Sequence, residues 1–501
     1  MSWFNKLETD ESLLTRTFYL VCVLGFLIRL WHLDAPIADR QSWNQVSTAT
    51  VIRHFVEDGI TPFHPQWDVL KGAETGPRIE AEEAPLFHVA AAILVRLFGW
   101  PLEPMARLLS VAGSLVGAVF LFRLTRRAAG GAAALFASCF YLLAPFSWYY
   151  GRAIMSDAWM LTAIIAAVER FDYWIRDESV GALCASAMFI ALAGLLKPFA
   201  LHVGFTLALW QLYRQGVRSL FDRRLAAVAF LAVLAPLAWV WYAARIGSLG
   251  NVTDAGGSVL TAQHIWGPLN LLWSPKFWFK LQARTFDQAA TPIVTALAMW
   301  AVAAKDTRRQ TMLPLFWLAG FLLYVMIVRD GNQMHDYYQL PVIPALAMLG
   351  GMGLGHLAQK ISPKWVYLIL GAFALMCALY VRQAFVLDLS SEVAGKLVRA
   401  VSRHDDLIAV LDPGVTRKNQ VLYAAHRRGW HLRNLGENTV NQYRHYGARW
   451  LVACLEEKQK AEHPEWVKDL EQLPRVSMIQ GPYGLRGGQH FIAVYDLKYR
   501  D

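Results

Sequence analysis

Long apolar runs dominate this 501-residue chain and constrain its fold more than any other feature. Hydrophobic residues make up 55% of the sequence and charged residues only 17%, whereas an average soluble domain carries roughly 25% charged residues. A helix needs roughly 20 mostly apolar residues to cross a bilayer. Apolar runs close to this length, several of them shorter, lie at 14–31, 85–99, 107–122, 131–147, 158–173, 180–196, 198–213, 225–244, 291–304, 311–328, 339–357 and 364–382. The pattern predicts a polytopic α-helical membrane protein.

Basic residues between these runs set the predicted orientation. The polar N-terminal segment lacks a small-residue cleavage site, so we interpret 14–31 as a retained helix and place the N-terminus in the cytoplasm. If 85–99 then lies on the outer surface, every strongly basic short loop falls on the inner side, as the positive-inside rule requires. If 85–99 crossed the membrane, those loops would face outward. The sequence therefore predicts eleven crossings, with the C-terminal tail outside.

The charge distribution also limits the partners. The formal net charge is +10, but the Lys and Arg residues stand in short clusters between apolar runs, where they set topology. We therefore expect contact with membrane lipids and predict no nucleic-acid partner. The 20 Trp and 26 Phe residues suit a protein that is anchored at two membrane–water interfaces. Accordingly, Trp43 is interpreted as an interfacial anchor rather than as a platform for sugar stacking.

The C-terminal tail differs in character from the rest of the chain. From about residue 387 it contains DDLIAVLDP, VLYAAHRRGWHL, ARWLVACLEE and HFIAVYDL, with polar, helix-like stretches between them. Short β-rich runs that alternate with helices indicate a small α/β domain. We therefore divide the chain into a transmembrane domain, 1–385, with outer loops at 34–106 and 245–290, and a soluble α/β domain, 386–501.

The predicted topology brings charged side chains to the outer membrane face, where charge is costly and needs a reason. A carboxylate there can accept a proton from a nucleophile, and a cation can stabilise a phosphate leaving group. Lys197 supplies one cation at the outer end of a helix. The other charged and aromatic groups lie in the segments 39–45, 80–86, 149–157 and 329–338. Their combination favours a reaction on an anionic substrate.

The order of these segments resembles that of the GT-C membrane glycosyltransferases. An acidic residue opens the first outer loop, and E-A-P-L-F, R-A-I-M-S-D, L-K-P and H-D-Y-Y-Q-L-P follow in that order. Within the group, the chain is most similar to bacterial relatives of the protein O-mannosyltransferases and of the lipid A aminoarabinose transferases. The resemblance covers roughly residues 14–382. It implies a multi-pass protein of the bacterial inner membrane with its C-terminal domain in the periplasm.

The resemblance also implies an activity. The donor would be a sugar on a polyprenyl phosphate, the transfer would invert the anomeric centre, and the acceptor would be a lipid, a glycan or a protein. Asp39 matches the acid that serves as general base, and Glu83 and Asp157 match acids that shape or polarise the pocket. Three residues are expected at the donor phosphate: Lys197, Arg152 and His335. Three more are expected to line the substrate pocket: Arg40, Tyr337 and Tyr338.

One departure from the family pattern leaves the cofactor open. Many relatives carry two consecutive acids in the first loop, whereas Arg40 follows Asp39 here. Divalent-metal use, known in parts of the superfamily, is therefore unsettled by the sequence. Glu83 and His264 are the candidate ligands if a metal is used.

Structural roles compete with each of these assignments. Asp39 could serve as a helix N-cap or as an interfacial charge, and Glu83 suits a helix start before Pro85. Lys197 could extend to the lipid headgroups, and Tyr337 and Tyr338 could belong to an aromatic belt.

Two other functions compete with glycosyl transfer. A transporter or flippase of lipid-linked saccharides would usually carry polar residues near the bilayer midplane and paired repeats. The predicted spans are almost free of such charges. An O-antigen ligase or polymerase would depend on a large outer loop rich in Arg and His, and the loop 245–290 contains few.

Overall fold

The computed structural model describes residues 8–73, 75–76, 78–246, 267–413, 419–432 and 434–498. These residues form two compact units. The first, which we call the helical unit, comprises residues up to Leu33, Ala81–Phe87 and Arg107–Gln383. The second, which we call the mixed unit, comprises Asp34–Glu80, His88–Ala106 and the chain from Ala384 onward.

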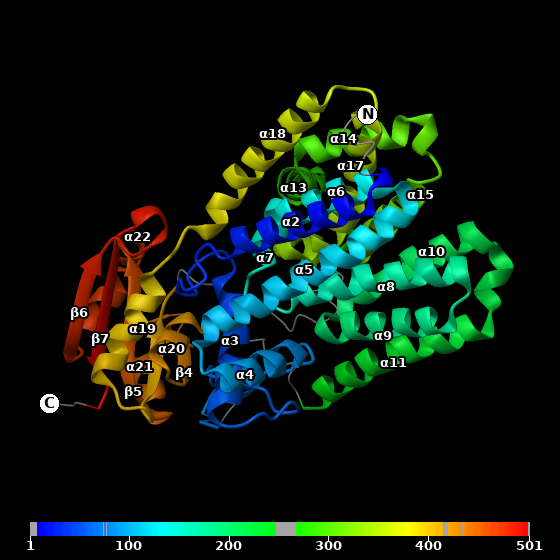
Figure 1. The fold of residues 1–501 in the computed structure, drawn as a ribbon. Helices are drawn as coiled ribbons and strands as arrows, with labels where there is room; N and C mark the ends of the chain where they lie inside the picture. Colours follow the sequence, from blue (N-terminus) through cyan, green and yellow to red (C-terminus); the bar gives the residue numbers. More distant parts are fainter. Residues whose placement is uncertain are drawn as a thin grey trace. The chain divides into compact units, whose positions relative to one another are not determined.

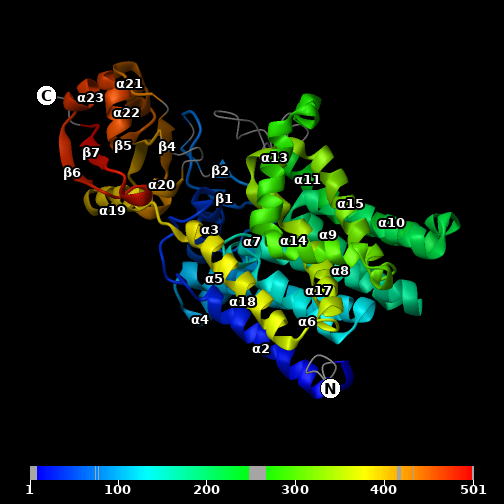
Figure 2. The same cartoon turned by 90° about the horizontal axis from the view of Figure 1, so that it is seen from above.

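The helical unit is built from long apolar helices. They are α2 (Glu11–Arg29), α5 (Leu102–Ala129), α6 (Gly131–Leu143), α7 (Pro145–Tyr150), α8 (Asp157–Asp177), α9 (Val180–Leu196), α10 (Val203–Gln215), α11 (Arg223–Arg245), α13 (Pro275–Ala283), α14 (Thr291–Ala303), α15 (Met312–Ile327), α16 (Arg329–Met334), α17 (Ile343–Ala358) and α18 (Pro363–Val381). Figures 1 and 2 show α9 packed between α8 and α11, while α17 packs against α6 and α14.

Each of the twelve apolar runs in the sequence contains a helix, including α4 (Leu86–Phe98) in the run 85–99. Five described helices are long and apolar enough to cross a membrane, and α4, α6, α9 and α15 are shorter apolar helices. Prolines explain two departures from the predicted runs. The run 131–147 breaks at Ala144 before Pro145, and the run 198–213 begins with the 3₁₀ turn η1 (Pro198–His202). The number of crossings and the surface position of α4 stay predictions.

The mixed unit contains a five-stranded sheet. Its elements are α3 (Ser42–Glu57), β1 (Gln66–Trp67), β2 (Arg78–Ile79), most of α4, α19 (Ser390–Val401), β3 (Leu407–Leu411), α20 (Gln420–Ala425), β4 (Gly429–Leu432), α21 (Glu437–His445), β5 (Ala448–Glu456), α22 (Glu457–Glu462), α23 (Pro464–Glu471), β6 (Arg475–Gly481) and β7 (His490–Asp496). The strand order is β4-β3-β5-β7-β6. β3 runs parallel to β4 and β5, whereas β7 runs antiparallel to β5 and β6.

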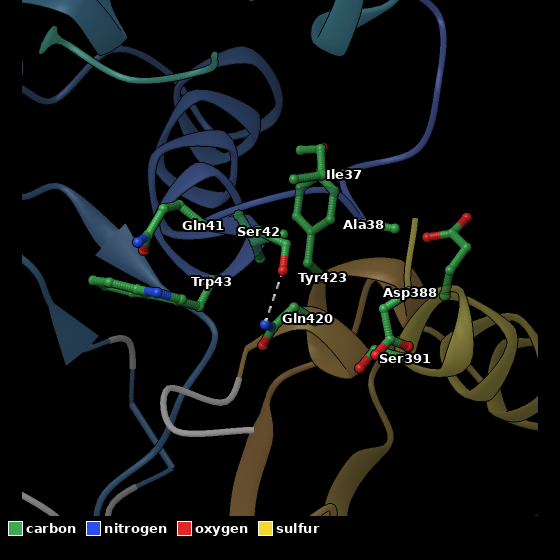
Figure 3. Close-up of a pocket in the computed structure, with 11 residues that line it drawn as sticks. Ile37, Ala38, Gln41, Ser42, Trp43, Asp388, Ser391, Gln420 and Tyr423 are labelled. Atoms are coloured by element: carbon green, nitrogen blue, oxygen red, sulfur yellow. Dashed lines mark hydrogen bonds between the residues drawn. The ribbon is translucent and has the colours of Figure 1, made fainter. Parts of the chain in front are cut away.

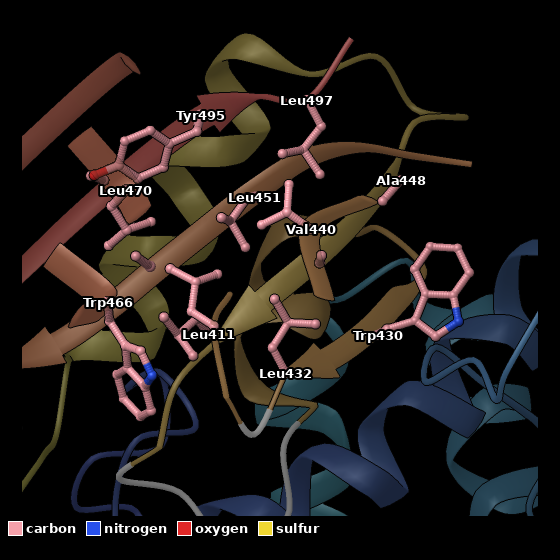
Figure 4. Close-up of a cluster of buried hydrophobic side chains, with 14 of the residues drawn as sticks. Leu411, Trp430, Leu432, Val440, Ala448, Leu451, Trp466, Leu470, Tyr495 and Leu497 are labelled. Carbon is pink, nitrogen blue, oxygen red and sulfur yellow. The ribbon is translucent and has the colours of Figure 1, made fainter. Parts of the chain in front are cut away.

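Both faces of this sheet are covered, which explains why β3 is continuously apolar. Ala409 and Leu411 point to one face, where Trp466 of α23 packs with the core drawn in Figure 4. Ile408 and Val410 point to the other face, under α19 and α20. Because successive side chains of a strand alternate between faces, a strand buried on both sides needs an unbroken apolar run. Strands β3, β4, β5 and β7 lie in the tail segments that the sequence indicated, and β6 was not predicted.

The segment 34–80 extends the C-terminal sheet, although the two are more than 300 residues apart in sequence. Val69 forms a parallel bridge with Gly429, and Leu70 belongs to the same hydrophobic cluster as Trp466 and Leu411. The sequence pattern predicts this segment as part of the transmembrane domain. In the structure, the stretch from Ala384 is joined by 34–80 and 88–106, so the mixed unit is discontinuous in sequence.

A buried ionic cluster fixes α3 to this added segment. Arg53 donates to Asp68 at 2.5 Å, and His54 Nε2 lies 3.0 Å from the same carboxylate. Burial would lower the pKa of His54, but the hydrogen bond and charge of Asp68 outweigh it and raise the pKa. Burial would likewise raise the pKa of Asp68, but Arg53 and His54 lower it. The cluster is therefore ionised and paired at mildly acidic pH.

We expect His54→Gln to destabilise the protein more at pH 5.5 than at pH 9. The stability supplied by protonated His54 is complete below its ordinary pKa and disappears as the pH rises through the raised pKa. The lowered pKa of Asp68 keeps its carboxylate charged across this window. Loss of a hydrogen bond between charged groups costs about 1.5–3 kcal/mol. Thermal unfolding of the purified protein at both pH values measures the difference.

The matched control is His463→Gln, because His463 pairs with Glu465 on the surface, where ion pairs contribute little. Equal destabilisation by His54→Gln at the two pH values would contradict the expectation.

Candidate functional site in the helical unit

Glu83 and Lys197 form an ion pair in the helical unit, with 2.6 Å between the carboxylate and Nζ. Lys197 follows the last residue of α9, where the chain becomes extended before Pro198. The segment containing Glu83 runs beside this helix end, since the Ala84 amide donates to the Leu195 carbonyl at 3.0 Å. The two side chains are 16% and 15% exposed, so the pair is largely shielded from solvent. Neighbouring backbone segments therefore place two of the predicted residues together.

Asp157 provides a second carboxylate to the same lysine, at 3.8 Å from Nζ. It is the first residue of α8, where the helix dipole favours a negative charge. Its side chain is fully buried, and within the described chain neither carboxylate oxygen has a hydrogen-bond partner. Lys197 thus forms a close ion pair with Glu83. It also lies near Asp157, whose carboxylate can still accept hydrogen bonds.

Asp336 lies beside this cluster and was not assigned a role from the sequence. It begins the 3₁₀ segment η6 (Asp336–Val342), and its Oδ1 accepts from the Tyr150 hydroxyl at 2.6 Å and from the Tyr337 amide at 2.9 Å. The Lys197 ammonium lies 5.9 Å from the centre of the Tyr337 ring. Asp336 lies in the H-D-Y-Y motif, which marked this segment in the sequence. Its contact with Tyr150 could not be inferred because the two residues are 186 positions apart.

The other predicted aromatic residues belong to a packed group. The His335 ring lies 5.3 Å from that of Tyr337 and 5.4 Å from that of Tyr338. Tyr338 also packs against Phe199, with 4.5 Å between ring centres. Tyr337 and Tyr338 are both buried, so they support the polar cluster from within the fold rather than forming an exposed belt.

Arg152 is buried and binds the backbone beyond α2. Its Nη2 donates to the His32 carbonyl at 2.7 Å, and Arg107 donates to the neighbouring Leu33 carbonyl at 2.7 Å. The structure gives Arg152 this backbone contact, and its assignment to the donor phosphate stays a prediction.

Asp39 and Arg40 belong to the mixed unit. Asp39 is 5% exposed, and its Oδ1 accepts from Gln45 Nε2 at 2.7 Å. The N-cap of α3 is Gln41, in a left-handed conformation, rather than Asp39. The Arg40 amide donates to the Ala384 carbonyl at 3.2 Å. The interpretation of Asp39 as a helix cap therefore loses its support, and the carboxylate is held in place by Gln45.

The metal hypothesis rests partly on a residue outside the described chain. His264 lies in the stretch 247–266, which the structure does not describe. Among the described residues, no group of three or more His, Cys, Asp or Glu side chains is placed to hold a metal ion. Glu83, the other candidate ligand, is paired with Lys197.

Comparison with known proteins identifies the fold. Residues 82–242 match the family described as dolichyl-phosphate-mannose-protein mannosyltransferase. ArnT from Cupriavidus metallidurans, solved with bound undecaprenyl phosphate, is 15% identical, with a TM-score of 0.61 over 95% of this chain and 97% of that one. The mycobacterial arabinofuranosyltransferase AftD is 15% identical, with a TM-score of 0.62 over 97% of this chain and 40% of that one. No curated protein matches the chain in sequence.

A third solved structure shares the arrangement. The Archaeoglobus fulgidus oligosaccharyltransferase, in complex with zinc and sulfate, is 12% identical, with a TM-score of 0.55 over 94% of this chain and 72% of that one. The chain is a multi-pass membrane protein with the fold of the GT-C membrane glycosyltransferases, which confirms the resemblance found in the sequence.

Removing the Lys197 cation should destabilise the helical unit. Lys197→Met leaves Glu83 and Asp157 as uncompensated carboxylates in a shielded site, at an expected cost of about 3 kcal/mol. The double variant Glu83→Gln/Lys197→Met should recover part of this loss because one charge is removed as well. Thermal unfolding in detergent measures both. A double variant no more stable than Lys197→Met would contradict the ion-pair interpretation.

Proposed function

We propose that the protein is an inverting glycosyltransferase that moves a sugar from a polyprenyl-phosphate donor to an acceptor hydroxyl. The observation that carries this proposal is the arrangement of Lys197 between Glu83 and Asp157 in a GT-C fold. Further support comes from ArnT, which shares the fold and was solved with undecaprenyl phosphate, and from the matched family, whose description names a dolichyl-phosphate sugar.

Lys197 supplies the cation for the donor phosphate. An ammonium group has three N–H donors, and the two carboxylates hold it charged and in a fixed position. A phosphate oxygen that accepts from the ammonium gains a charge-assisted hydrogen bond. As the sugar leaves, negative charge grows on this oxygen, and a fixed cation stabilises it without reorganisation.

Asp39 acts as the general base in this proposal. The acceptor oxygen attacks the anomeric carbon from the face opposite the phosphate and forms the new C–O bond. The bond between the anomeric carbon and the phosphate oxygen breaks, and its electron pair stays on the polyprenyl phosphate. The acceptor proton passes to the Asp39 carboxylate. The hydrogen bond from Gln45 fixes the direction of that carboxylate.

The sidedness of the reaction follows from the basic loops. With those loops in the cytoplasm, the N-terminus is cytoplasmic, and transfer takes place on the outer face of the bacterial inner membrane. Lipid, glycan and protein hydroxyls all suit this chemistry as acceptors.

Asp39→Asn should reduce transfer by about 10²–10⁴-fold, because an amide cannot accept the acceptor proton. The assay compares, by mass spectrometry, the lipid and protein glycans of cells that lack the gene and of cells complemented with each variant. Asp34→Asn is the matched control, since Asp34 is exposed five residues earlier in the chain. Near-normal glycans with Asp39→Asn, at normal protein levels, would refute this role.

Lys197→Gln should weaken binding of undecaprenyl phosphate by roughly 10-fold or more, the equivalent of one hydrogen bond to a charged group. Titration of the purified protein in nanodiscs with undecaprenyl phosphate measures the affinity. Lys364→Gln, at an exposed lysine in the first turn of α18, controls for general attraction of the anionic lipid. An unchanged affinity in Lys197→Gln would exclude Lys197 from the phosphate site.

A further inference from the structure

The mixed unit contains a cavity of about 160 Å³. Figure 3 shows its wall: Gln41 and Trp43 at the start of α3, Gln420 and Tyr423 of α20, and Asp388 and Ser391 at the start of α19. A water molecule occupies roughly 30 Å³ in the liquid, so the cavity has room for several waters or for one sugar ring.

Backbone and side-chain hydrogen bonds hold the wall of this cavity together. The Asp388 amide donates to the Ala38 carbonyl at 2.7 Å. On the opposite side, the Gln420 side chain contacts Ser42 Oγ at 3.5 Å. The Asn419 side chain next to it donates to Ser47 at 3.3 Å. The segment that contains α3 is thus joined to α19 and α20, which lie far from it in the sequence, around one small space.

The lining is typical of carbohydrate recognition. Gln420 provides an amide group for sugar hydroxyls. Asp388 accepts both hydrogen bonds from Ser390 at Oδ1, so its Oδ2 can accept from a ligand. The Trp43 indole offers an apolar surface to the C–H groups of a sugar ring. This role of Trp43 in sugar stacking differs from the interfacial anchoring that the sequence predicted.

The charge of the lining restricts the ligand. Asp388 and Glu392 are carboxylates, and the lining residues that the structure describes include no Lys, Arg or His. Glu392 is partly neutralised by Lys396, at 3.0 Å. Such a cavity repels phosphate and carboxylate groups but accepts hydroxyl or ammonium groups. The donor phosphate therefore does not suit it, whereas a neutral or amino sugar does.

We propose that this cavity binds a neutral or amino sugar of the acceptor, so that the acceptor is a glycan or glycolipid. This proposal rests on the proposed function, because it assigns the acceptor of that transfer. Asp39, the proposed base, lies in the chain between Ala38 and Gln41, both of which line the cavity. A sugar in the cavity is therefore bound by the chain segment that carries the base.

The test uses the full-length protein in nanodiscs and saturation-transfer NMR. The probes are methyl glycosides of neutral hexoses and pentoses, the methyl glycoside of glucosamine, and methyl glucuronide. We expect at least one neutral or amino sugar to bind, and methyl glucuronide to bind at least tenfold more weakly. Gln420→Ala and Asp388→Asn should each weaken binding by about three- to tenfold, as loss of one hydrogen bond predicts.

Matched controls come from the same unit. Gln472→Ala and Asp405→Asn change the same residue types at exposed positions outside the cavity and should bind sugar as the unchanged protein does. Trp43→Phe, which keeps an aromatic ring, replaces either cavity variant that fails to fold. Absence of binding by every probe, equal binding of the glucuronide, or cavity variants that bind normally would overturn the proposal.

The readout separates this proposal from the proposed function. Asp39→Asn should lose transfer while retaining sugar binding, because Asp39 is not among the lining residues. If transfer is observed but cavity variants leave the KM for the acceptor unchanged, the cavity assignment fails and the function stands. If no transfer is observed but the cavity variants lose sugar binding, the binding site stands and the function fails.

Discussion

Charge at the ends of apolar helices must be matched within the protein, and the polar architecture of the helical unit depends on this constraint. Lys197 at the end of α9 is matched by Glu83 and faces Asp157. Arg29, fully buried at the end of α2, donates to the carbonyls of Gly25, Leu142 and Ser147, each at 2.9 Å. Apart from the Gly25 carbonyl of α2 itself, these oxygen atoms come from other segments of the helical unit. Because an unmatched charge there costs several kcal/mol, the helices must pack so that donors and acceptors meet.

The sequence predicted the local features of this fold well. Apolar runs of helical length identified the helices, and continuous β-branched or apolar segments identified four strands of the sheet. These patterns are local, since periodicity depends on a helix or strand burying its own side chains. Strand β6 was not predicted because its residues are mostly exposed and it lacks a continuous buried run. Pro145 and Pro198 were visible in the sequence, but their effect on the helix ends depends on how the chain continues beyond them.

Contacts between distant segments could not be predicted in the same way. The order of short motifs predicted that Glu83 and Lys197 lie at the same membrane face, but it did not predict that they form an ion pair. The hydrogen bond between Tyr150 and Asp336 was not predicted. The segment 68–70 carries no signal that it will pair beside β4, because a single bridge and one buried leucine leave no periodic pattern. Arg29 likewise lay within the predicted run 14–31 and was assigned no role. Its three partners are backbone carbonyls. Because every residue has one, no pattern of side chains in the sequence identifies these partners.

The two proposed binding regions differ in whether they offer a cation, and this difference has a chemical consequence. In the donor region Lys197 lies between Glu83 and Asp157, whereas the described lining of the cavity beside Trp43 has carboxylates and amides without a cation. A transferase with two sugar-containing substrates must avoid binding either one in the wrong place. The donor carries a phosphate and the acceptor hydroxyl does not, so a cationic hydrogen-bond donor in one region helps to sort them. A phosphate oxygen can accept from the Lys197 ammonium, but in the cavity it meets Asp388 and Glu392. The shape of the cavity is then left to select among acceptors.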